Sequence, residues 1–427
     1  MNSADAVRVQ HGLEAMGFSS TRDPMQADVL VLITCVVRQS AEDKVVGHLS
    51  SLKSLKHCRP DALITVMGCL VDDEVALRQR FPYVDAFALP SDTDTLLRVV
   101  GQRFVGAMPM GEPTVPQQPS ATALVPISEG CDHHCTYCIV RLRRGPQRSR
   151  PLPDIVSEVQ QWVTRGARQV TLLGQNVDAY GQDWPSPRPD LADVLRAVHG
   201  IDGLSRIRFL TSHPGDMSDR VIETVAELPR VCPHFELPVQ SGDNAVLKRM
   251  GRNYTVDAYR CLIAGIRQRV PACSIATDVI VGFPGETTVQ FQATYDLLEQ
   301  LRFDAVHIAK YSARPGTAAA KLDDDVPAEE KERRRALLEE LQTEIVAQIN
   351  AALLNQSVEV LVEGRRRGRW MARTVTNKLV FFEDTIDRRG QLLDVRIRWT
   401  GPWSLLGEPV PRSPGHAIEP TADRTDS

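Results

Sequence analysis

The chain has 427 residues, a net charge of −4 at pH 7, 42% hydrophobic residues and 24% charged residues. This composition is ordinary for globular domains and argues against a disordered or fibrous chain, while the length allows two to four domains. No apolar run approaches the ~20 residues that cross a bilayer, so we expect a cytoplasmic protein with no membrane partner. In that compartment, the nine cysteines do not favour a disulfide framework.

The first block, residues 1–105, alternates helices with short apolar runs. Val7, Leu13 and Met16 give its opening stretch helical spacing. The elements predicted after it are strands at 29–34 and 62–68 and helices at 41–57 and 72–80. This alternation predicts a parallel α/β domain, which a Pro-rich, Gln-rich linker at 106–120 ends.

The second block, residues 121–354, contains six strand-like runs, most of them separated by helical stretches. Repeated βα units of this length imply a parallel sheet, and six units are too few to close an eight-stranded barrel. We therefore predict a partial (β/α)6 barrel with a trailing amphipathic helix over 327–354. The six runs are 122–128, 168–174, 206–212, 234–240, 274–282 and 305–311.

The third block, residues 355–410, consists of short β-patterned runs. Such runs predict a small β-barrel. The tail, residues 411–427, is rich in Pro, Ser, Thr and Asp, a composition that favours disorder. The fold class expected for the whole chain is therefore α/β, with an N-terminal parallel α/β domain, a central partial barrel and a C-terminal small β-barrel.

Cys131, Cys135 and Cys138 stand in the spacing C-x3-C-x2-C directly after the first strand of the second block. Thiolates this close on one loop can converge on a metal centre. A tetrahedral zinc ion would need a fourth ligand, which His133 or His134 can supply. A [4Fe-4S] cluster can be held by three thiolates with one iron left open, and the two histidines are then ordinary loop residues.

Polar residues follow or end successive strands of the second block, at the edge where α/β folds place their ligands. Taken singly, each is equally compatible with an ordinary strand-to-helix turn. Taken together, they favour a shared cofactor pocket at the carboxyl edge of the sheet. These residues are Gln175, Asn176, Ser212, Gln240, Ser241 and Asp278.

Two further cysteines follow strands of the first block. Cys35 follows the run 29–34 and Cys69 follows the run 62–68, so they are 34 residues apart, about the length of one βαβ unit. Adjacent parallel strands lie ~4.8 Å apart, which lets the two thiols approach a common metal cluster. The alternative is a pair of buried structural cysteines.

In this order the motifs resemble those of methylthiotransferases in the radical S-adenosylmethionine superfamily, from about residue 1 to residue 405. The resemblance rests on "ADVLVLITCVV", "VMGCLVDDE", "GCDHHCTYCIV", "LLGQNVDAYG", "LPVQSGDNAVLKRMGRNYT", "TDVIVGFPGET" and "KYSARPGTAAAKL". The third block resembles a TRAM RNA-binding module. Within the family, "LLGQNVDAYG", "LPVQSG" and "ARTVTNKLVFFE" are most similar to the members that make 2-methylthio-N6-dimethylallyladenosine in tRNA.

The resemblance implies two [4Fe-4S] clusters and S-adenosyl-L-methionine as cofactors. The three closely spaced cysteines would hold the cluster that cleaves S-adenosylmethionine to a 5′-deoxyadenosyl radical, with Tyr137 and the strand-end residues around the cofactor. Cys35 and Cys69 match two of the three ligands of an auxiliary cluster that carries the sulfur. The implied reaction places a methylthio group at C2 of N6-isopentenyladenosine at tRNA position 37, next to the anticodon.

The implied partners are a tRNA carrying prenylated adenosine, an electron donor such as a flavodoxin or ferredoxin, and a sulfur donor. Two arginine-rich runs, "VRLRRGPQRSR" and "EGRRRGRW", would by themselves be solvated faces. In an RNA-modifying enzyme they are candidates for phosphate contacts. The arginines concerned are Arg141, Arg143 and Arg144 near the cysteine loop, and Arg365, Arg366, Arg367 and Arg369 in the third block.

Other functions are compatible with the same motifs. One is a methylthiotransferase acting on N6-threonylcarbamoyladenosine, and another is a radical methyltransferase that lacks the auxiliary sulfur cluster. A third, from a different class, is a noncatalytic or impaired Fe–S protein that binds RNA. Iron and sulfide content would separate the second function, and reductive formation of 5′-deoxyadenosine would separate the third.

The first helix has no strand before it, although parallel α/β domains normally begin with one. The 34-residue spacing places another strand-end cysteine near residue 1, and members of the family carry a strand ending in Gly-Cys-Gln just before the residues aligned with Met1 and Asn2. We therefore expect Met1 to be an internal methionine, with the third auxiliary ligand preceding it. The rival expectation is a genuine loss of that strand and ligand.

Overall fold

The computed structural model describes residues 1–36, 39–104 and 120–411. The chain forms two compact units, of which the first ends at Gln342 and the second begins at Thr343. The expected linker (106–120) and the expected tail (411–427) lie, except for their residues 120 and 411, outside the described residues. Within the described ranges, no helix is both long and apolar enough to cross a membrane.

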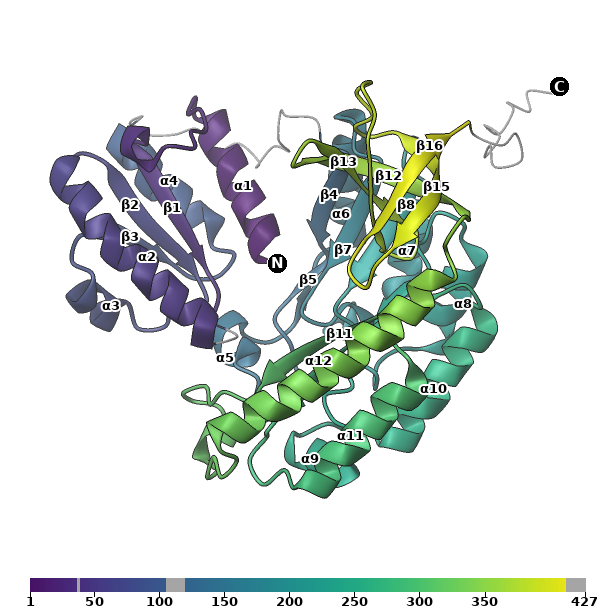
Figure 1. Cartoon of the computed structure of the whole chain (residues 1–427). Helices are drawn as coiled ribbons and strands as arrows, with labels where there is room; N and C mark the ends of the chain where they lie inside the picture. Colours follow the sequence, from purple (N-terminus) through teal and green to yellow (C-terminus); the bar gives the residue numbers. More distant parts are fainter. Residues whose placement is uncertain (37–38, 105–119, 412–427) are drawn as a thin grey trace. The chain divides into compact units, whose positions relative to one another are not determined.

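The N-terminal domain is a three-stranded parallel sheet, in the order β1-β2-β3, with helices on both faces (Figure 1). Its elements are α1 (Asn2–Ala15), the 3-10 turn η1 (Pro24–Gln26), β1 (Val29–Thr34), α2 (Gln39–Cys58), β2 (Leu63–Gly68), α3 (Glu74–Arg80), β3 (Ala86–Ala88) and α4 (Thr93–Phe104). Successive side chains of the central strand β2 point to opposite faces of the sheet, so helices can pack on both faces. Ile64 and Val66 pack with residues of α2 and α3, whereas Leu63 and Met67 pack with residues of α1 and α4. The strands and helices predicted here are confirmed.

The second domain is a half-barrel of six strands, as the sequence predicts. The strands are β4 (Thr122–Pro126), β7 (Gln169–Leu173), β8 (Arg206–Leu210), β9 (His234–Glu236), β10 (Ser274–Val281) and β11 (Ala305–Lys310). Two parallel sheets, β4-β7-β8 and β9-β10-β11, are formed. A parallel bridge between Ile207 and Val231 and a hydrogen bond from the Ser212 N–H to the Glu236 carbonyl (3.2 Å) link them. All six strands therefore present their carboxyl ends at one edge.

Helices alternate with the strands of the half-barrel (Figure 1). They are α5 (Val140–Arg144), α6 (Leu152–Thr164), α7 (Leu191–His199), α8 (Asp219–Glu227), α9 (Asn244–Arg249), α10 (Val256–Arg269), α11 (Thr288–Leu301) and α12 (Ala328–Ala351), with 3-10 turns η2 (Val177–Ala179) and η3 (Ala319–Lys321). Capping residues fix several helix starts: Asp190 and Thr287 form capping boxes at α7 and α11. A short hairpin, β5 (Ser128–Glu129) with β6 (Arg148–Ser149), follows β4.

The second unit contains a closed five-stranded barrel in the order β12-β13-β14-β16-β15. Its strands are β12 (Ser357–Arg366), β13 (Arg369–Thr374), β14 (Leu379–Phe382), β15 (Leu392–Thr400) and β16 (Leu405–Val410). Val360, Trp370, Phe382 and Ile397 belong to its buried core. The barrel confirms the predicted C-terminal β-domain, and closure leaves no long unpaired strand edge.

Candidate active site and metal centre

The three cysteines of the C-x3-C-x2-C motif lie on one loop between β5 and α5, and the paired strands β5 and β6 bring the ends of this segment together. Gly130, just before the motif, has a φ of +72°, and an added Cβ would clash with the Pro146 carbonyl. The Cys131 N–H donates to the Gly145 carbonyl (3.2 Å), and the Cys138 N–H donates to the Cys135 carbonyl (3.0 Å). The loop is therefore shaped by its own backbone contacts.

Cys135 lies close enough to Cys131 and Cys138 to raise the pKa of both thiols. Burial is the largest effect and raises the pKa of Cys138 to about 11, while the positive charge of Arg252 opposes that rise. The Nη1 of Arg252 lies 3.5 Å from Cys135 Sγ. A positive group next to a ligand sulfur stabilises the thiolate that metal binding requires.

The donor set fits an iron–sulfur cluster better than a single zinc ion. In the described residues, just one group of three His, Cys, Asp or Glu side chains has ligand atoms all within 4.8 Å of one another, and it does not contain the cysteines. Four ligands at about 2.3 Å from one zinc ion would lie closer together than that. A zinc site would take its fourth ligand from His133 or His134, but both have other partners. His133 contacts the Asp216 carboxylate, and a ring nitrogen of His134 lies 2.7 Å from an Arg141 nitrogen.

The tight group is His133, His213 and Asp216. The two imidazoles stack with centroids 3.8 Å apart, and His133 Nε2 lies 2.5 Å from Asp216 Oδ2. Asn176 donates to the same carboxylate oxygen (2.5 Å). Burial, followed by nearby Arg252, lowers the pKa of His213 to about 3. These contacts tie the cysteine loop to the ends of β7 and β8.

Four buried polar atoms beyond the ends of β7, β8 and β9 have no hydrogen-bond partner among the described residues. They are Gln175 Oε1, Asn176 Oδ1, His213 Nε2 and Gln240 Oε1. Gln240 also has a φ of +70°, a strained backbone for a residue other than glycine. Because buried polar groups are nearly always paired, this set indicates a polar ligand at the carboxyl edge.

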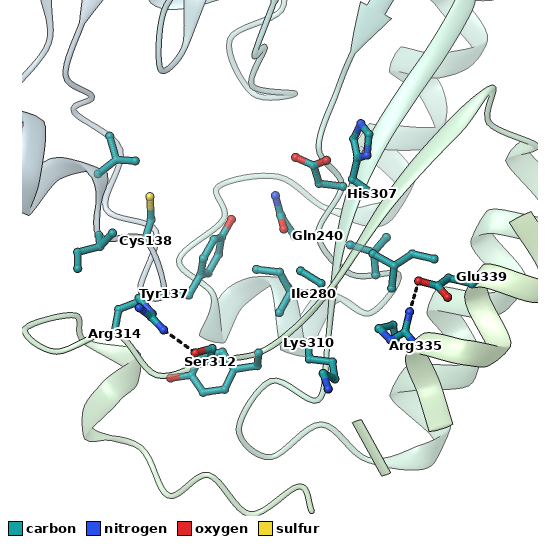
Figure 2. A pocket seen from close by; sticks show the side chains of 17 residues that line it. Tyr137, Cys138, Gln240, Ile280, His307, Lys310, Ser312, Arg314, Arg335 and Glu339 are labelled. Atoms are coloured by element: carbon teal, nitrogen blue, oxygen red, sulfur yellow. Dashed lines mark hydrogen bonds and ion pairs between the residues drawn. The ribbon is translucent and has the colours of Figure 1, made fainter. Parts of the chain in front are cut away.

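A cavity of about 630 Å³ opens beside the cysteine loop. Tyr137 and Gln240 point into it (Figure 2), and Cys138 and Asp278 also line it. Burial raises the pKa of the Tyr137 hydroxyl well above its usual range, so the phenol is neutral. The other walls include Ile280, His307, Ile308, Ala309 and Lys310. The size suits a drug-sized ligand.

Two of the predicted pocket residues have structural contacts instead. The Ser241 hydroxyl lies 3.4 Å from the Thr294 hydroxyl of α11, and the Ser212 hydroxyl donates to Asp178 Oδ1 (3.0 Å). Burial raises the pKa of Asp178 to about 7. Of the predicted residues, Tyr137, Gln240 and Asp278 line the cavity, and Gln175 and Asn176 are at the same strand ends with unpartnered atoms.

Cys35 and Cys69 are brought together by the N-terminal sheet. The strands β1 and β2 are adjacent and parallel, and Thr34 pairs with Gly68, so the cysteines directly after them are neighbours. Cys35 contributes to the raised pKa of Cys69, whose largest cause is burial. The positive charge of Arg144 opposes that rise. The strand ends that carry these two cysteines are therefore adjacent, as predicted.

Comparisons with known proteins agree along the whole chain. Residues 125–298 match the Radical SAM superfamily, residues 1–88 match Uncharacterized protein family UPF0004, and residues 352–410 match the TRAM domain. A tRNA-2-methylthio-N(6)-dimethylallyladenosine synthase of Roseiflexus sp. (strain RS-1) is 49% identical over 417 residues, covering 95% of this chain and 87% of that protein. The chain belongs to this synthase family. A synthase of the same name from Chloroflexus aurantiacus (strain ATCC 29366 / DSM 635 / J-10-fl) is 46% identical over 419 residues, covering 96% of this chain and 89% of that protein.

A solved structure shares the fold at low identity. The radical S-adenosylmethionine methyltransferase TsrM from Kitasatospora setae, with cobalamin and [4Fe-4S] cluster bound, has a TM-score of 0.56 and 13% identity, covering 86% of this chain and 77% of that chain. This likeness concerns the fold alone. It agrees with the half-barrel predicted for the second block.

The family acts on RNA, so the arginine runs are candidates for phosphate contacts. In the run near the cysteine loop, however, two arginines form ion pairs within the protein. The side chain of Arg144, one of the candidates for a phosphate contact, is 5% exposed and pairs with Asp5 inside the protein. Arg143 pairs with Asp72 (2.6 Å) and is 17% exposed. Clustered positive charge in sequence did not reveal that these side chains turn inward.

In the C-terminal barrel, the four arginines of the run "EGRRRGRW" differ in their contacts. Arg365 lies 4.6 Å from the Trp370 ring and donates to the Asp384 carbonyl, and Arg369 pairs with Glu383. Arg366 and Arg367 are exposed at the turn between β12 and β13.

Two exposed tryptophans, Trp399 (50% exposed) and Trp403 (65% exposed), lie near the turn between β15 and β16. Asn350 holds that turn by donating to the Gly401 carbonyl (2.8 Å). Sequence reasoning missed these tryptophans, because a β-pattern does not tell which aromatic side chains are exposed.

Proposed function

We propose that this chain adds a methylthio group to C2 of N6-isopentenyladenosine at position 37 of tRNA, next to the anticodon, with S-adenosyl-L-methionine as cosubstrate. Family membership supplies the reaction. The observation that supports it most is local: three facing thiols and three unpartnered amide oxygens gather at the carboxyl edge of one half-barrel.

Two donor sets fit two [4Fe-4S] clusters. The ligands would be Cys131, Cys135 and Cys138 for the radical-generating cluster, and Cys35 and Cys69 for the auxiliary cluster. When bound, the first cluster supplies the electron that cleaves S-adenosylmethionine, and the auxiliary cluster supplies the sulfur. The chain's own task is to present thiolates, and Arg252 beside Cys135 provides positive charge for this.

The unpartnered oxygens suit the cosubstrate. S-adenosylmethionine carries an ammonium group, ribose hydroxyls and an adenine amino group, and all of these donate hydrogen bonds. The buried oxygens of Gln175, Asn176 and Gln240 are acceptors in need of donors. These three residues would orient the cosubstrate, while Tyr137 and Asp278 border the cavity that Gln240 lines.

The cavity also suits the target base. An adenine in an anticodon loop must leave its stack to reach an enclosed site, as in other enzymes that act on nucleobases. Ile280, Ile308 and Ala309 give the cavity an apolar wall. Such a wall would accept the prenyl substituent through burial of apolar surface, at about 25 cal/mol per Å².

The C-terminal barrel would supply RNA affinity through Arg366 and Arg367, with Trp399 and Trp403 as stacking surfaces for unpaired bases. Arg365 and Arg369 would shape this surface from their internal contacts. The reaction also requires an electron donor, such as a flavodoxin or ferredoxin, and a sulfur donor. We place the reaction in the cytoplasm, where its tRNA substrate is used.

The test is mass spectrometry of tRNA nucleosides from a strain that makes the prenylated nucleoside but lacks its own synthase. Expression of this chain should produce 2-methylthio-N6-isopentenyladenosine, and the Cys138→Ala variant should not. A methylthio group found on N6-threonylcarbamoyladenosine instead would overturn the proposed substrate. Unchanged nucleosides, with soluble protein that binds iron, would overturn the activity.

A further inference from the structure

Two arginines of the half-barrel, both with buried side chains, form hydrogen bonds with the N-terminal domain around the strand ends that carry Cys35 and Cys69. Arg144 ends α5, only six residues after Cys138. Arg314 follows β11. Their side chains are 5% and 3% exposed. In the sequence, Arg144 belongs to the arginine-rich run "VRLRRGPQRSR" and Arg314 to the motif "KYSARPGTAAAKL".

Arg144 is the centre of a buried polar network. It donates to Asp5 Oδ2 (3.0 Å), to Asn2 Oδ1 (2.8 Å) and to the Ser91 hydroxyl (2.9 Å). Asn2 in turn donates its side-chain amide to the Thr34 carbonyl (3.0 Å), which also accepts the Cys69 N–H (3.2 Å), so the network reaches the ends of β1 and β2. Ser91 closes the network by donating to Asp5 Oδ1 (3.1 Å), and it does so from a strained backbone with a φ of +62°.

Arg314 forms a similar set of hydrogen bonds with the segment that follows Cys35. Its Nη1 donates to the carbonyl of Val36, the residue after Cys35 (3.1 Å), and to Glu42 Oε2 (2.9 Å). Its Nη2 donates to the Ser312 hydroxyl (2.8 Å), the contact drawn beside the cavity in Figure 2. Ser312 thus orients the guanidinium from within the half-barrel, while Val36 and Glu42 of the N-terminal domain accept its other hydrogen bonds.

These contacts are suited to fixing geometry rather than to adding stability. Guanidinium is always charged and donates in a rigid planar fork, so it specifies direction as well as distance. Asp5 is 1% exposed, and loss of Arg144 would leave that carboxylate buried without its cation. Group transfer between two sites also needs close alignment, with reacting atoms about 3–3.5 Å apart.

We propose that Arg144 and Arg314 are positioning residues that fix the strand ends carrying Cys35 and Cys69 on the half-barrel, at a set place relative to the radical site. Arg144 does this most directly, because it ends α5, the helix that begins two residues after Cys138. The proposal rests on the proposed function in one respect, namely that these segments carry ligands of the sulfur-donating cluster.

The first test uses metal-free protein under anaerobic conditions and needs no activity. Alkylation of each cysteine is timed by peptide mass spectrometry in Arg144→Met, Arg314→Met and, as a matched control, exposed Arg148→Met. Arg144→Met should speed alkylation of buried Cys69, and Arg314→Met should speed alkylation of Cys35. Alkylation of the C-x3-C-x2-C cysteines should match the control. Rates at Cys35 and Cys69 equal to those of the control would overturn the proposal.

The second test uses reconstituted protein and compares two rates. Cleavage of S-adenosylmethionine without tRNA should stay near the parent rate in Arg144→Met. Methylthiolation should fall about tenfold or more, since displacement by 1 Å can cost on the order of a hundredfold. Arg144→Lys, which keeps the charge but loses the fork, should recover part of it. An equal fall in both rates would mean that Arg144 supports the radical site itself, and would overturn the proposal.

The two proposals can fail separately. If the parent protein makes no methylthiolated nucleoside but the alkylation pattern follows the arginine substitutions, the proposed function fails and the positioning role stands. If the parent is active and the variants behave as Arg148→Met does in both tests, the positioning role fails and the proposed function stands.

Discussion

Replacing Asp178 by Asn should remove a pH-dependent loss of stability from the half-barrel. Asp178 lies in the 3-10 turn after β7, and its carboxylate accepts hydrogen bonds from the Ser212 hydroxyl and the His213 N–H, both at 3.0 Å. An Asn amide preserves both contacts, because its oxygen can accept from His213 and its nitrogen can donate to Ser212. The substitution therefore removes the titration and leaves the shape of the site intact.

The magnitude follows from the pKa of this carboxyl. Burial raises the pKa of Asp178 to about 7, from an ordinary value of 3.8. Because the folded-state pKa is the higher one, the contribution of this carboxyl to stability is fully present below pH 3.8 and is lost as the pH rises to 7. Between pH 5 and pH 7 the loss is about 2 kcal/mol, and by pH 8 it is nearly 3 kcal/mol, at ~1.36 kcal/mol for each pKa unit. The Asp178→Asn variant should not lose this stability as the pH rises.

The assay is urea unfolding of the metal-free protein after equilibration at pH 5 and at pH 8. A brief alkylation pulse at one common pH reports how far the half-barrel has opened, since Cys232 is 2% exposed and donates its N–H to Ile207 of β8. Relative to the parent, Asp178→Asn should gain about 3 kcal/mol more at pH 8 than at pH 5. The exposed Asp202→Asn is the control and should show no such gain. An equal effect of Asp178→Asn at both pH values would refute the reasoning.

Three further predictions concern the metal centre and the RNA surface. Replacing all three cysteines of the C-x3-C-x2-C motif by Ala should abolish reductive cleavage of S-adenosylmethionine, and 5′-deoxyadenosine above the no-enzyme level would contradict the assignment. The double change Arg366→Ala and Arg367→Ala should flatten the salt dependence of tRNA binding by roughly 1.4 to 1.8 in the log–log slope, or ~0.7–0.9 for each phosphate contact; an unchanged slope rules out this pair. Trp403→Ala should weaken tRNA binding by about 1–3 kcal/mol through lost base stacking and leave that slope alone; unchanged affinity removes Trp403 from the interface.

The elements that the sequence predicted correctly are those whose causes are local. The cysteine loop needs only its own spacing, and the six strands of the half-barrel follow from short apolar runs between helical stretches. The strands that precede Cys35 and Cys69 were predicted to be neighbours because they are one βαβ unit apart, and Thr34 does pair with Gly68. Each of these inferences depends on few residues, close together in the chain.

Contacts between residues far apart in the chain could not be predicted from the sequence. Nothing near His133 indicates that its partner is Asp216, which is 83 residues away. The strained backbone of Gln240, with a φ of +70°, has no signature in its neighbours, yet it belongs to the residue whose oxygen is left unpartnered at the cavity. Ser241, the very next residue, was predicted with equal weight, and its hydroxyl instead lies near Thr294.

The arginines show why side-chain type alone could not decide function here. In the sequence, Arg144 and Arg367 belong to similar basic runs, and both are candidates for phosphate contacts. In the structure, Arg144 is buried against an aspartate, whereas Arg367 is exposed at a turn. A buried guanidinium must be matched by an acid, so the decisive residue for Arg144 is Asp5, 139 residues earlier in the chain. A basic run therefore predicts RNA contact only after its acidic partners have been found or excluded.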